Sequence, residues 1–245
     1  MDKRYFFLSF FLFFLFFEDL AISHHKIYSP RVDEERRSLE WRGHFNFDDR
    51  SDLDNEHHHV LETEYSWNNF WQSEVEFHIS DKTDTPLDWE KLEIQNQVQI
   101  YDSSFYAAAV YFSYNFISQG TKGDEIEYKF LNEFQNSKFK FITNFVFEKQ
   151  VGKSASGSTE FSLTNYIFFE KPIYEDVRFG IIGFSELGEI SNFKTFHNQE
   201  HQYGFQFERE FKLRDKEIEF VLGYLNGLTD QSSNHSLLWN AEIEF

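Results

Sequence analysis

The last nine residues of the chain, LLWNAEIEF at positions 237–245, carry the pattern that decides the fold. Apolar side chains occupy every second position, and polar ones stand between most of them: Leu237, Trp239, Ala241, Ile243 and Phe245 against Asn240, Glu242 and Glu244. Alternation with a period of two is typical of a β-strand whose two faces meet different surroundings. The chain is therefore predicted to end in a strand with one apolar and one polar face.

The same alternation recurs through the preceding two hundred residues and predicts twelve strands in all. The predicted strands span residues 39–47, 61–67, 71–79, 92–100, 106–116, 126–130, 139–147, 161–169, 177–185, 203–208, 217–224 and 237–245. The eighth alternates less regularly than the others, and the ninth carries Gly180 and Gly183. No amphipathic helix, internal repeat or linker interrupts the series, so we expect one all-β domain.

Composition narrows the class of protein further. The 245 residues include 33 Phe, 12 Tyr and 5 Trp, with a formal net charge of −19 and no Cys. Such acidity excludes the basic surface of a nucleic-acid-binding protein. Without Cys, the chain has no disulfide, thiol nucleophile or thiolate metal site.

The N-terminus has the pattern of a secretory signal peptide. A basic start precedes the apolar run 5–17, which holds eight of the Phe residues, and Ala21 and Ser23 fit the rule for cleavage after residue 23. The run is too short for a comfortable transmembrane helix, which needs about 20 residues. Glu18 and Asp19 are atypical near a cleavage site, so an uncleaved anchor remains the alternative. We expect residues 1–23 to be removed.

Two features favour a membrane barrel over a secreted β-sandwich, which would also alternate. One strand face is crowded with aromatic residues, whereas the other carries Glu, Gln, Asn and Arg. The predicted connections also alternate between longer, Asp- and Ser-rich loops and shorter turns. Both features are typical of membrane barrels. We therefore predict a closed antiparallel transmembrane β-barrel of about twelve strands, with short periplasmic turns and longer extracellular loops.

The signal peptide, the alternation and the C-terminal Phe245 together resemble a bacterial outer-membrane β-barrel protein. This resemblance covers essentially the whole mature chain, with the barrel at residues 39–245. It implies a location in the outer membrane, in contact with its lipid and lipopolysaccharide. It also implies that the barrel-assembly machinery reads the last strand, through Trp239, Ile243 and Phe245. The resemblance is to porin-like proteins without an assigned activity, and it implies neither a cofactor nor an oligomeric state.

The polar strand face predicts an acidic lumen. Its predicted lining residues are Glu40, Arg42, Glu62, Glu64, Glu74, Glu76, Glu127, Glu208, Glu217, Glu219 and Glu242. An acidic lining attracts cations and repels anions, which favours a passive channel for small cationic or neutral solutes. The alternative is a barrel filled by side chains that pair across strands, with a structural or surface-interaction role through its acidic loops.

Residues 24–38 precede the first predicted strand. Arg31, Arg36 and Arg37 could fold into the acidic lumen as a plug, but the interleaved acids 33–35 leave the segment nearly neutral. This balance favours a solvated periplasmic tail.

The loop after the first strand is a weak candidate for chemistry. Asp52, Asp54, His57 and His59 are residue types that bind divalent metals, but the spacing fails the calcium-loop pattern. A hydrolase site at the barrel rim could combine Asp54, His57 and Asp84. Since no nucleophile elbow or zinc-protease motif is present in the sequence, an enzyme is less favoured than a channel.

Overall fold

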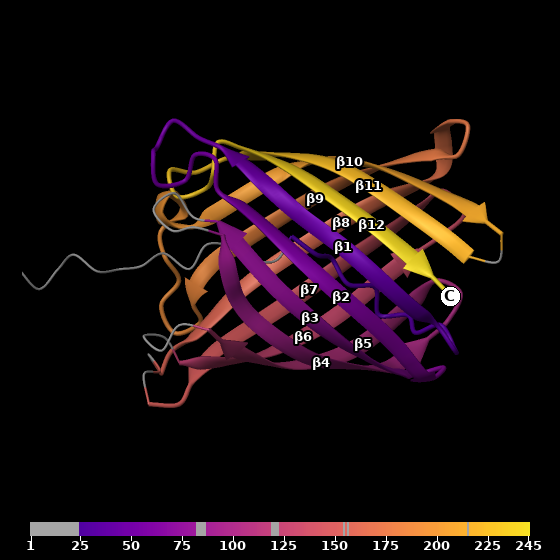
Figure 1. The fold of residues 1–245 in the computed structure, drawn as a ribbon, viewed down its shortest axis with the longest axis horizontal. Helices are drawn as coiled ribbons and strands as arrows, with labels where there is room; N and C mark the ends of the chain where they lie inside the picture. Colours follow the sequence, from indigo (N-terminus) through magenta and orange to yellow (C-terminus); the bar gives the residue numbers. More distant parts are fainter. Residues whose placement is uncertain (1–24, 82–86, 119–122, 154, 156, 215) are drawn as a thin grey trace, which may run out of the picture.

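In a computed structural model, the chain forms a closed barrel of twelve antiparallel strands (Figure 1). The structure describes residues 25–81, 87–118, 123–153, 155, 157–214 and 216–245; the predicted signal peptide and Asp84 lie outside these ranges. The strands are β1 (Arg37–Phe47), β2 (His57–Asn68), β3 (Trp71–Asp81), β4 (Asp88–Asp102), β5 (Tyr106–Ile117), β6 (Asp124–Gln135), β7 (Phe139–Val151), β8 (Thr159–Tyr174), β9 (Val177–Glu189), β10 (Glu200–Leu213), β11 (Lys216–Gly227) and β12 (His235–Glu244).

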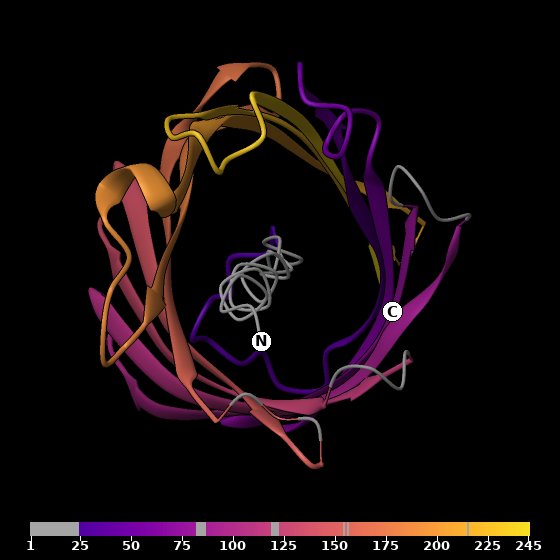
Figure 2. The same cartoon turned by 90° about the vertical axis from the view of Figure 1, so that its left-hand side faces the viewer.

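Consecutive strands pair along the whole chain, and the first and last strands close the ring (Figure 2). At the seam between β1 and β12, Leu39 lies opposite Ile243 and Phe45 opposite Leu237. Closure gives each strand two hydrogen-bonded neighbours, so no sheet edge is left unpaired, as a bilayer requires. The predicted closed antiparallel barrel of twelve strands is confirmed.

The connections alternate in length, as predicted. Longer ones, at the long-loop end of the barrel, span residues 48–56, 82–87, 118–123, 152–158, 190–199 and 228–234. Shorter ones, at the short-turn end, span residues 69–70, 103–105, 136–138, 175–176 and 214–215. The predicted end of the eighth strand is wrong, because β8 continues to Tyr174 through an irregular stretch in its pairing with β9.

Helical structure is minimal in the part of the chain that the structure describes. A single 3-10 helix, Phe196–Asn198, lies in the connection between β9 and β10. The described residues contain no helix that is long and apolar enough to cross a bilayer.

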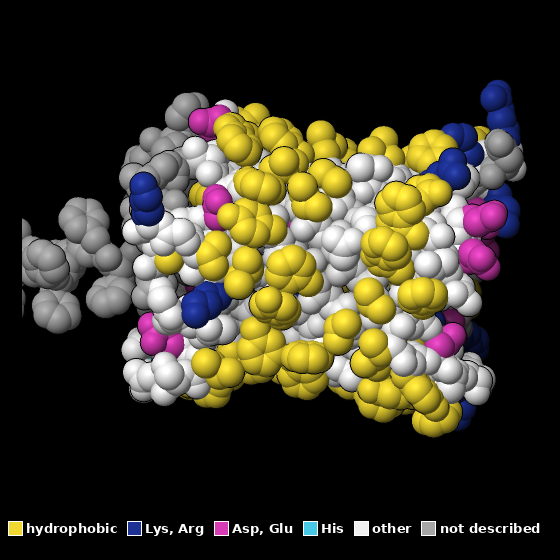
Figure 3. Space-filling view, turned by 90° about the horizontal axis from the view of Figure 1, so that it is seen from below, with side chains coloured by type: hydrophobic (Ala, Val, Ile, Leu, Met, Phe, Trp, Pro, Cys, Tyr) yellow, Lys and Arg dark blue, Asp and Glu magenta, His cyan; other side chains and the backbone are white. Residues whose placement is uncertain are grey.

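Large apolar side chains cover the outside of the barrel. Trp41, Phe77, Phe130, Phe205 and Leu222 are among the many that remain exposed. On the face seen in Figure 3, apolar side chains occupy the middle of the wall, and most charged ones gather toward the two ends. Such a band matches the lipid-facing surface of a membrane barrel.

The inner face is mostly polar, but it carries an apolar patch on the side of β7 to β12. The buried cluster of Ile142, Tyr166, Phe168, Ile182, Phe184, Leu225 and Leu238 comes from β7 to β12. Phe168 and Phe184 therefore point inward, although the alternation placed most aromatic residues toward lipid. This apolar inner patch interrupts the predicted polar lining.

A charged clamp joins two loops above the seam between β1 and β12. The Asp48 carboxylate accepts hydrogen bonds from the Arg50 side chain at 2.8 Å and from the Asn234 backbone N–H at 2.8 Å. Arg50 in turn donates to the Ser232 carbonyl oxygen at 2.6 Å. The hydrogen bonds from Arg50 hold the pKa of Asp48 well below its usual range. The clamp therefore stabilises the fold above the usual carboxyl pKa and is lost as the pH falls through the lowered value.

Candidate functional site

A continuous row of glutamates crosses the inner wall on seven neighbouring strands, β10, β11, β12, β1, β2, β3 and β4. Each lies directly opposite the next in the strand register: Glu210, Glu219, Glu242, Glu40, Glu62, Glu76 and Glu93. We call this row the acidic belt. Like charges directly opposite one another destabilise a sheet, so the belt requires counter-charges or water. The counter-charges are distributed unevenly along the belt.

Arg42 neutralises the part of the belt that lies on β1 to β3. Its guanidinium donates to Glu40 at 2.6 Å, to Glu76 at 2.6 Å and to Glu62. All four side chains are buried. One planar guanidinium thus holds three carboxylates by hydrogen bonds that are both charged and shielded from water, which strengthens them.

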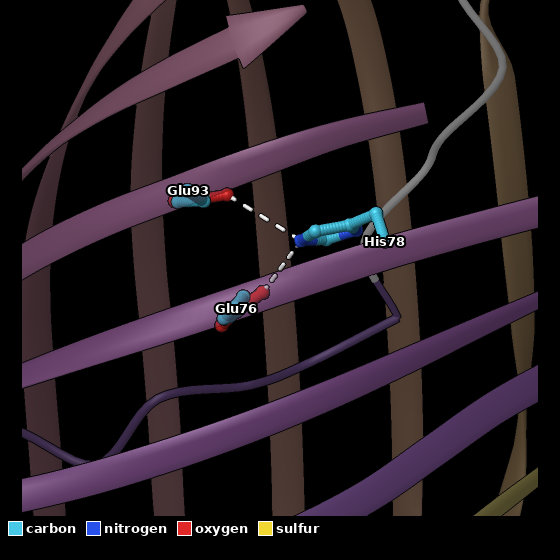
Figure 4. Close-up of side chains that lie close together, drawn as sticks. All are labelled: Glu76, His78 and Glu93. Carbon is cyan, nitrogen blue, oxygen red and sulfur yellow. Dashed lines mark hydrogen bonds and ion pairs between the residues drawn. The ribbon is translucent and has the colours of Figure 1, made fainter. Parts of the chain in front are cut away.

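The belt ends on β4 in a cluster of acids and one histidine (Figure 4). His78 Nε2 lies 2.8 Å from Glu76 Oε2 and 3.8 Å from Glu93 Oε2. These three residues could in principle hold a metal ion. However, Arg42 already contacts Glu76, and Lys91 Nζ lies 3.4 Å from Glu93. The cluster is therefore a network of internal ion pairs, to which we assign no metal.

Residues 25–36, which we call the luminal segment, run through the interior of the barrel (Figure 2). Lys26 Nζ lies 2.5 Å from Glu62 and 3.5 Å from Glu74. Tyr28 is buried, and its hydroxyl donates to Glu76 at 3.0 Å. The segment thus adds a second cation to the side of the belt that Arg42 serves.

The expectation of a solvated tail is wrong for this segment. Arg31 Nε donates to Glu133 at 2.5 Å, and Arg36 Nη2 donates to Glu242 at 2.5 Å. Arg37 instead faces outward, over the Tyr65 ring. The segment is nearly neutral overall, but its acids 33–35 are exposed at the short-turn end while its cations reach the luminal carboxylates. The near-neutral net charge of the segment therefore led to a wrong prediction, because it sums exposed acids and inward-facing cations that lie in different surroundings.

A cavity of about 520 Å³ occupies the other side of the lumen. It lies between the luminal segment and the inner faces of β7 to β12 and of β1 to β3. Its acidic lining includes Glu208, Glu210, Glu219 and Glu242, and its apolar lining includes Ile142, Phe168 and Phe184. The cavity is therefore bordered by β7 to β12 and by β1 to β3, whereas no residue of β4 to β6 lines it.

Acidic residues outnumber basic ones around the cavity, whose basic lining residues are Lys26, Arg31, Arg36, Arg42, Lys140 and Arg178. Arg178 donates to Glu208 at 2.8 Å and also contacts Glu210. Glu219, between Glu210 and Glu242 in the belt, has no basic group within 4.0 Å among the described residues. The cavity wall thus keeps an excess of negative charge where the lumen is hollow.

The structure places the predicted lining residues in three surroundings. Buried among ion pairs and hydrogen bonds lie Glu40, Arg42, Glu62, Glu64, Glu74, Glu76 and Glu127. Partly exposed beside the cavity lie Glu208, Glu219 and Glu242. Glu217 also borders the cavity but is exposed and paired with Lys212. Sequence reasoning missed Glu93 and Glu210, although both stand on the polar parity of their strands.

The loop residues considered for metal binding or hydrolysis do not converge. His57 Nε2 lies 3.3 Å from Asp81, and His59 stacks on Trp41. Asp54 accepts a hydrogen bond from the backbone N–H of Asp48, and Asp52 is exposed. His57 and His59 face out of the barrel with ring centroids 5.2 Å apart, while His58 between them faces in. Among the described residues, no cluster of metal-ligating groups includes any of the three.

The comparisons with known proteins agree with this architecture. No protein-family model and no curated protein matches the chain. Among solved structures, the NanC porin is similar with a TM-score of 0.58 and 12% identity, over 84% of this chain and 98% of that one. The KdgM porin follows with a TM-score of 0.55 and 9% identity, over 85% and 98%. A further structure, "KdgM porin in complex with disordered oligogalacturonate", gives 0.54 at 9% identity.

These likenesses define the class to which the fold belongs. The chain is a twelve-strand β-barrel of the type seen in the NanC and KdgM outer-membrane porins. At such low identity the likeness concerns the fold, so any activity must be argued from the lumen itself.

Proposed function

We propose that the protein resides in the bacterial outer membrane and forms a passive channel for small cationic or neutral solutes. The observation that carries this proposal is the uneven neutralisation of the acidic belt. On the cavity side, Glu219 and its neighbours outnumber the basic groups, so a solute in the cavity meets a negative potential. Fixed charges on low-dielectric walls concentrate counter-ions and exclude ions of the same sign.

The wall chemistry also suggests which solutes are excluded. One similar porin was solved with an oligogalacturonate, a sugar chain that carries carboxylates. A belt of directly opposed glutamates would repel such a polyanion. We therefore infer that this barrel, although it shares the fold of that porin, does not pass such an anionic sugar chain. The apolar inner patch beside the belt favours small solutes that combine a positive group with an apolar body.

Bilayer recordings under a salt gradient test the proposal. We expect the purified protein to conduct and its reversal potential to show preference for the cation. Glu219→Lys should shift the reversal potential toward anions, because it places a positive charge in the cavity wall. Glu189→Lys makes the same change of charge at the long-loop end of β9, where the side chain is exposed, and serves as the control.

Three outcomes would contradict the proposal. A correctly folded barrel without conductance would favour the filled, structural role. Anion preference of the unchanged protein would refute the argument from the acidic belt. Equal shifts for Glu219→Lys and Glu189→Lys would show that the overall charge, rather than the cavity wall, sets selectivity.

Export and assembly give a separate prediction. We infer that the last strand, with Trp239, Ile243 and Phe245, is the segment that the barrel-assembly machinery reads. Phe245 follows β12, and its ring lies 3.7 Å from Lys216 Nζ. Deleting Phe245 is expected to lower the amount of folded protein in outer-membrane fractions, measured as the band that changes its gel migration on boiling. The control for the deletion is the substitution Phe245→Tyr, which keeps an aromatic side chain at this position. Equal amounts for the deletion and for Phe245→Tyr would contradict this role.

A further inference from the structure

We propose that the luminal segment is a tethered plug, which closes the β2–β7 side of the lumen and can leave the wall without unfolding the barrel. The part of this proposal that concerns conductance rests on the proposed channel function, whereas the movement of the segment does not. The proposal concerns residues 25–36, which belong to no strand. Their backbone and side chains nevertheless form hydrogen bonds and ion pairs with the inner wall.

Side chains of the wall hold the backbone of the segment, except at Arg36, whose carbonyl accepts a hydrogen bond from the Ser66 N–H of β2 at 2.9 Å. Asn144 accepts a hydrogen bond from the Tyr28 N–H at 2.9 Å and donates to the Tyr28 carbonyl at 2.9 Å. Gln97 donates to the Ser29 carbonyl at 3.0 Å, and Gln99 accepts from the Val32 N–H at 2.8 Å. Because these bonds lie outside the sheet ladder, breaking them removes no strand pairing from the barrel.

Three cationic contacts add attraction that depends on salt. Lys26 meets Glu62, Arg31 meets Glu133, and Arg36 meets Glu242. The Tyr28 ring also lies under Lys129 Nζ at 3.9 Å. The side chains of Lys26, Arg31 and Arg36 retain some exposure, so salt and competing cations can reach these pairs. The segment therefore binds the inner wall through its cationic side chains, as a ligand that is covalently part of the same chain.

A turn at the short-turn end provides the pivot. The Arg36 N–H donates to the Asp33 carbonyl at 3.3 Å, and Glu35 has a positive φ of 65°. The chain then enters β1 at Arg37. From this turn the segment runs back through the lumen as far as His25, whose ring nitrogen lies 2.9 Å from Gln202 near the start of β10. Once the contacts of residues 25–32 with the wall are broken, rotation of the backbone at this turn is sufficient to release the segment.

The cavity explains why release would matter for passage. Residues 25–29 of the segment form one wall of the 520 Å³ cavity. If the segment leaves, its volume joins the cavity, and Glu62, Glu74 and Glu133 lose their tethered cations. The passage would become both wider and more negative.

Locking the segment in place tests the proposal. The Ser29 hydroxyl lies 2.8 Å from the Glu133 carboxylate, and the chain has no cysteine of its own. In the variant Ser29→Cys with Glu133→Cys, a short thiol-reactive cross-linker cleavable by reductant would hold the segment on the wall. We expect single-channel conductance to be low when cross-linked and to recover on reduction. A variant lacking residues 25–36 should conduct several-fold better than the full chain, with stronger cation preference.

A labelling experiment keeps the proposal separate from the channel function. In Glu133→Cys alone, attack by a small charged thiol reagent reports whether the segment leaves the wall. The rate should rise with salt toward the rate in Glu133→Cys lacking residues 25–36. The proposal is overturned if labelling of the full chain stays absent at all salt concentrations, or if locked and reduced channels conduct equally. Salt-dependent labelling without conductance in any variant would instead refute the channel and leave the movable plug standing.

Discussion

Arg42→Ala is expected to cost about 3–5 kcal/mol of folding free energy, because removing one partner of a buried ion pair leaves the other uncompensated. Here one guanidinium serves three carboxylates, those of Glu40, Glu62 and Glu76, and all of them are buried. Lys26 lies close to Glu62 and, at 3.7 Å, to Glu40, but the structure gives it no contact with Glu76. In the variant, the repulsion between directly opposed glutamates is therefore no longer compensated by the Arg42 guanidinium.

Urea unfolding in lipid, followed by the gel migration of unboiled samples, measures this cost. Arg37→Ala is the matched control, because Arg37 is on the same strand but faces outward over Tyr65. Adding Glu62→Gln and Glu76→Gln to Arg42→Ala should recover part of the loss by removing two of the stranded charges. A midpoint for Arg42→Ala equal to that of Arg37→Ala would show that water or the luminal segment already screens these carboxylates.

Strand number and side-chain direction could be predicted because both follow from local alternation. Glu62 and Glu76 stand on the polar parity of their strands, and the structure buries both in the lumen. Successive side chains in a strand must point to opposite faces, so this inference needs no knowledge of the neighbours. It weakened on β8, where an irregular stretch and inward-facing aromatics break the period of two.

The acidic belt could not be predicted, because it is a property of register. Glu93 and Glu210 join it only because the turns place Glu76 opposite Glu93 and Glu219 opposite Glu210. A shift of two residues in any pairing would keep every side chain on its face and still destroy the row. Sequence patterns indicate the face of a residue but not its level in the barrel.

The luminal segment escaped prediction for a related reason. One of its anchors, Asn144, lies 116 residues away from Tyr28 in the chain. The apolar inner patch depends on the same segment, since Ile27 packs against the cluster that contains Phe168 and Phe184. The sequence of the luminal segment does not reveal the apolar inner patch, and the sequence of the patch does not reveal the segment. The inward position of each is explained only by its contacts with the other inside the barrel.

The second large effect concerns the outer surface, where Phe205→Arg is expected to cost about 2–4 kcal/mol if the site lies near the bilayer midplane. Phe205 lies near the middle of β10, opposite Ile181 on β9 and Tyr224 on β11, and its ring remains 39% exposed. Phe179 and Phe207 adjoin it with ring centroids at 6.3 and 5.7 Å. An arginine there would face hydrocarbon, with no luminal carboxylate within reach because the sheet lies between them.

Unfolding titrations in bilayers, read by tryptophan fluorescence, provide the measurement. Phe205→Leu preserves an apolar surface and should lose much less stability than Phe205→Arg. Phe196→Arg makes the same chemical change at an exposed position in the 3-10 helix of the long-loop end, outside the apolar band, and should be tolerated. The difference between the two arginine variants therefore reports the environment of the band. If the two arginine variants lost equal stability in lipid, the exposed aromatic side chains of β10 would have to face water or protein rather than a membrane.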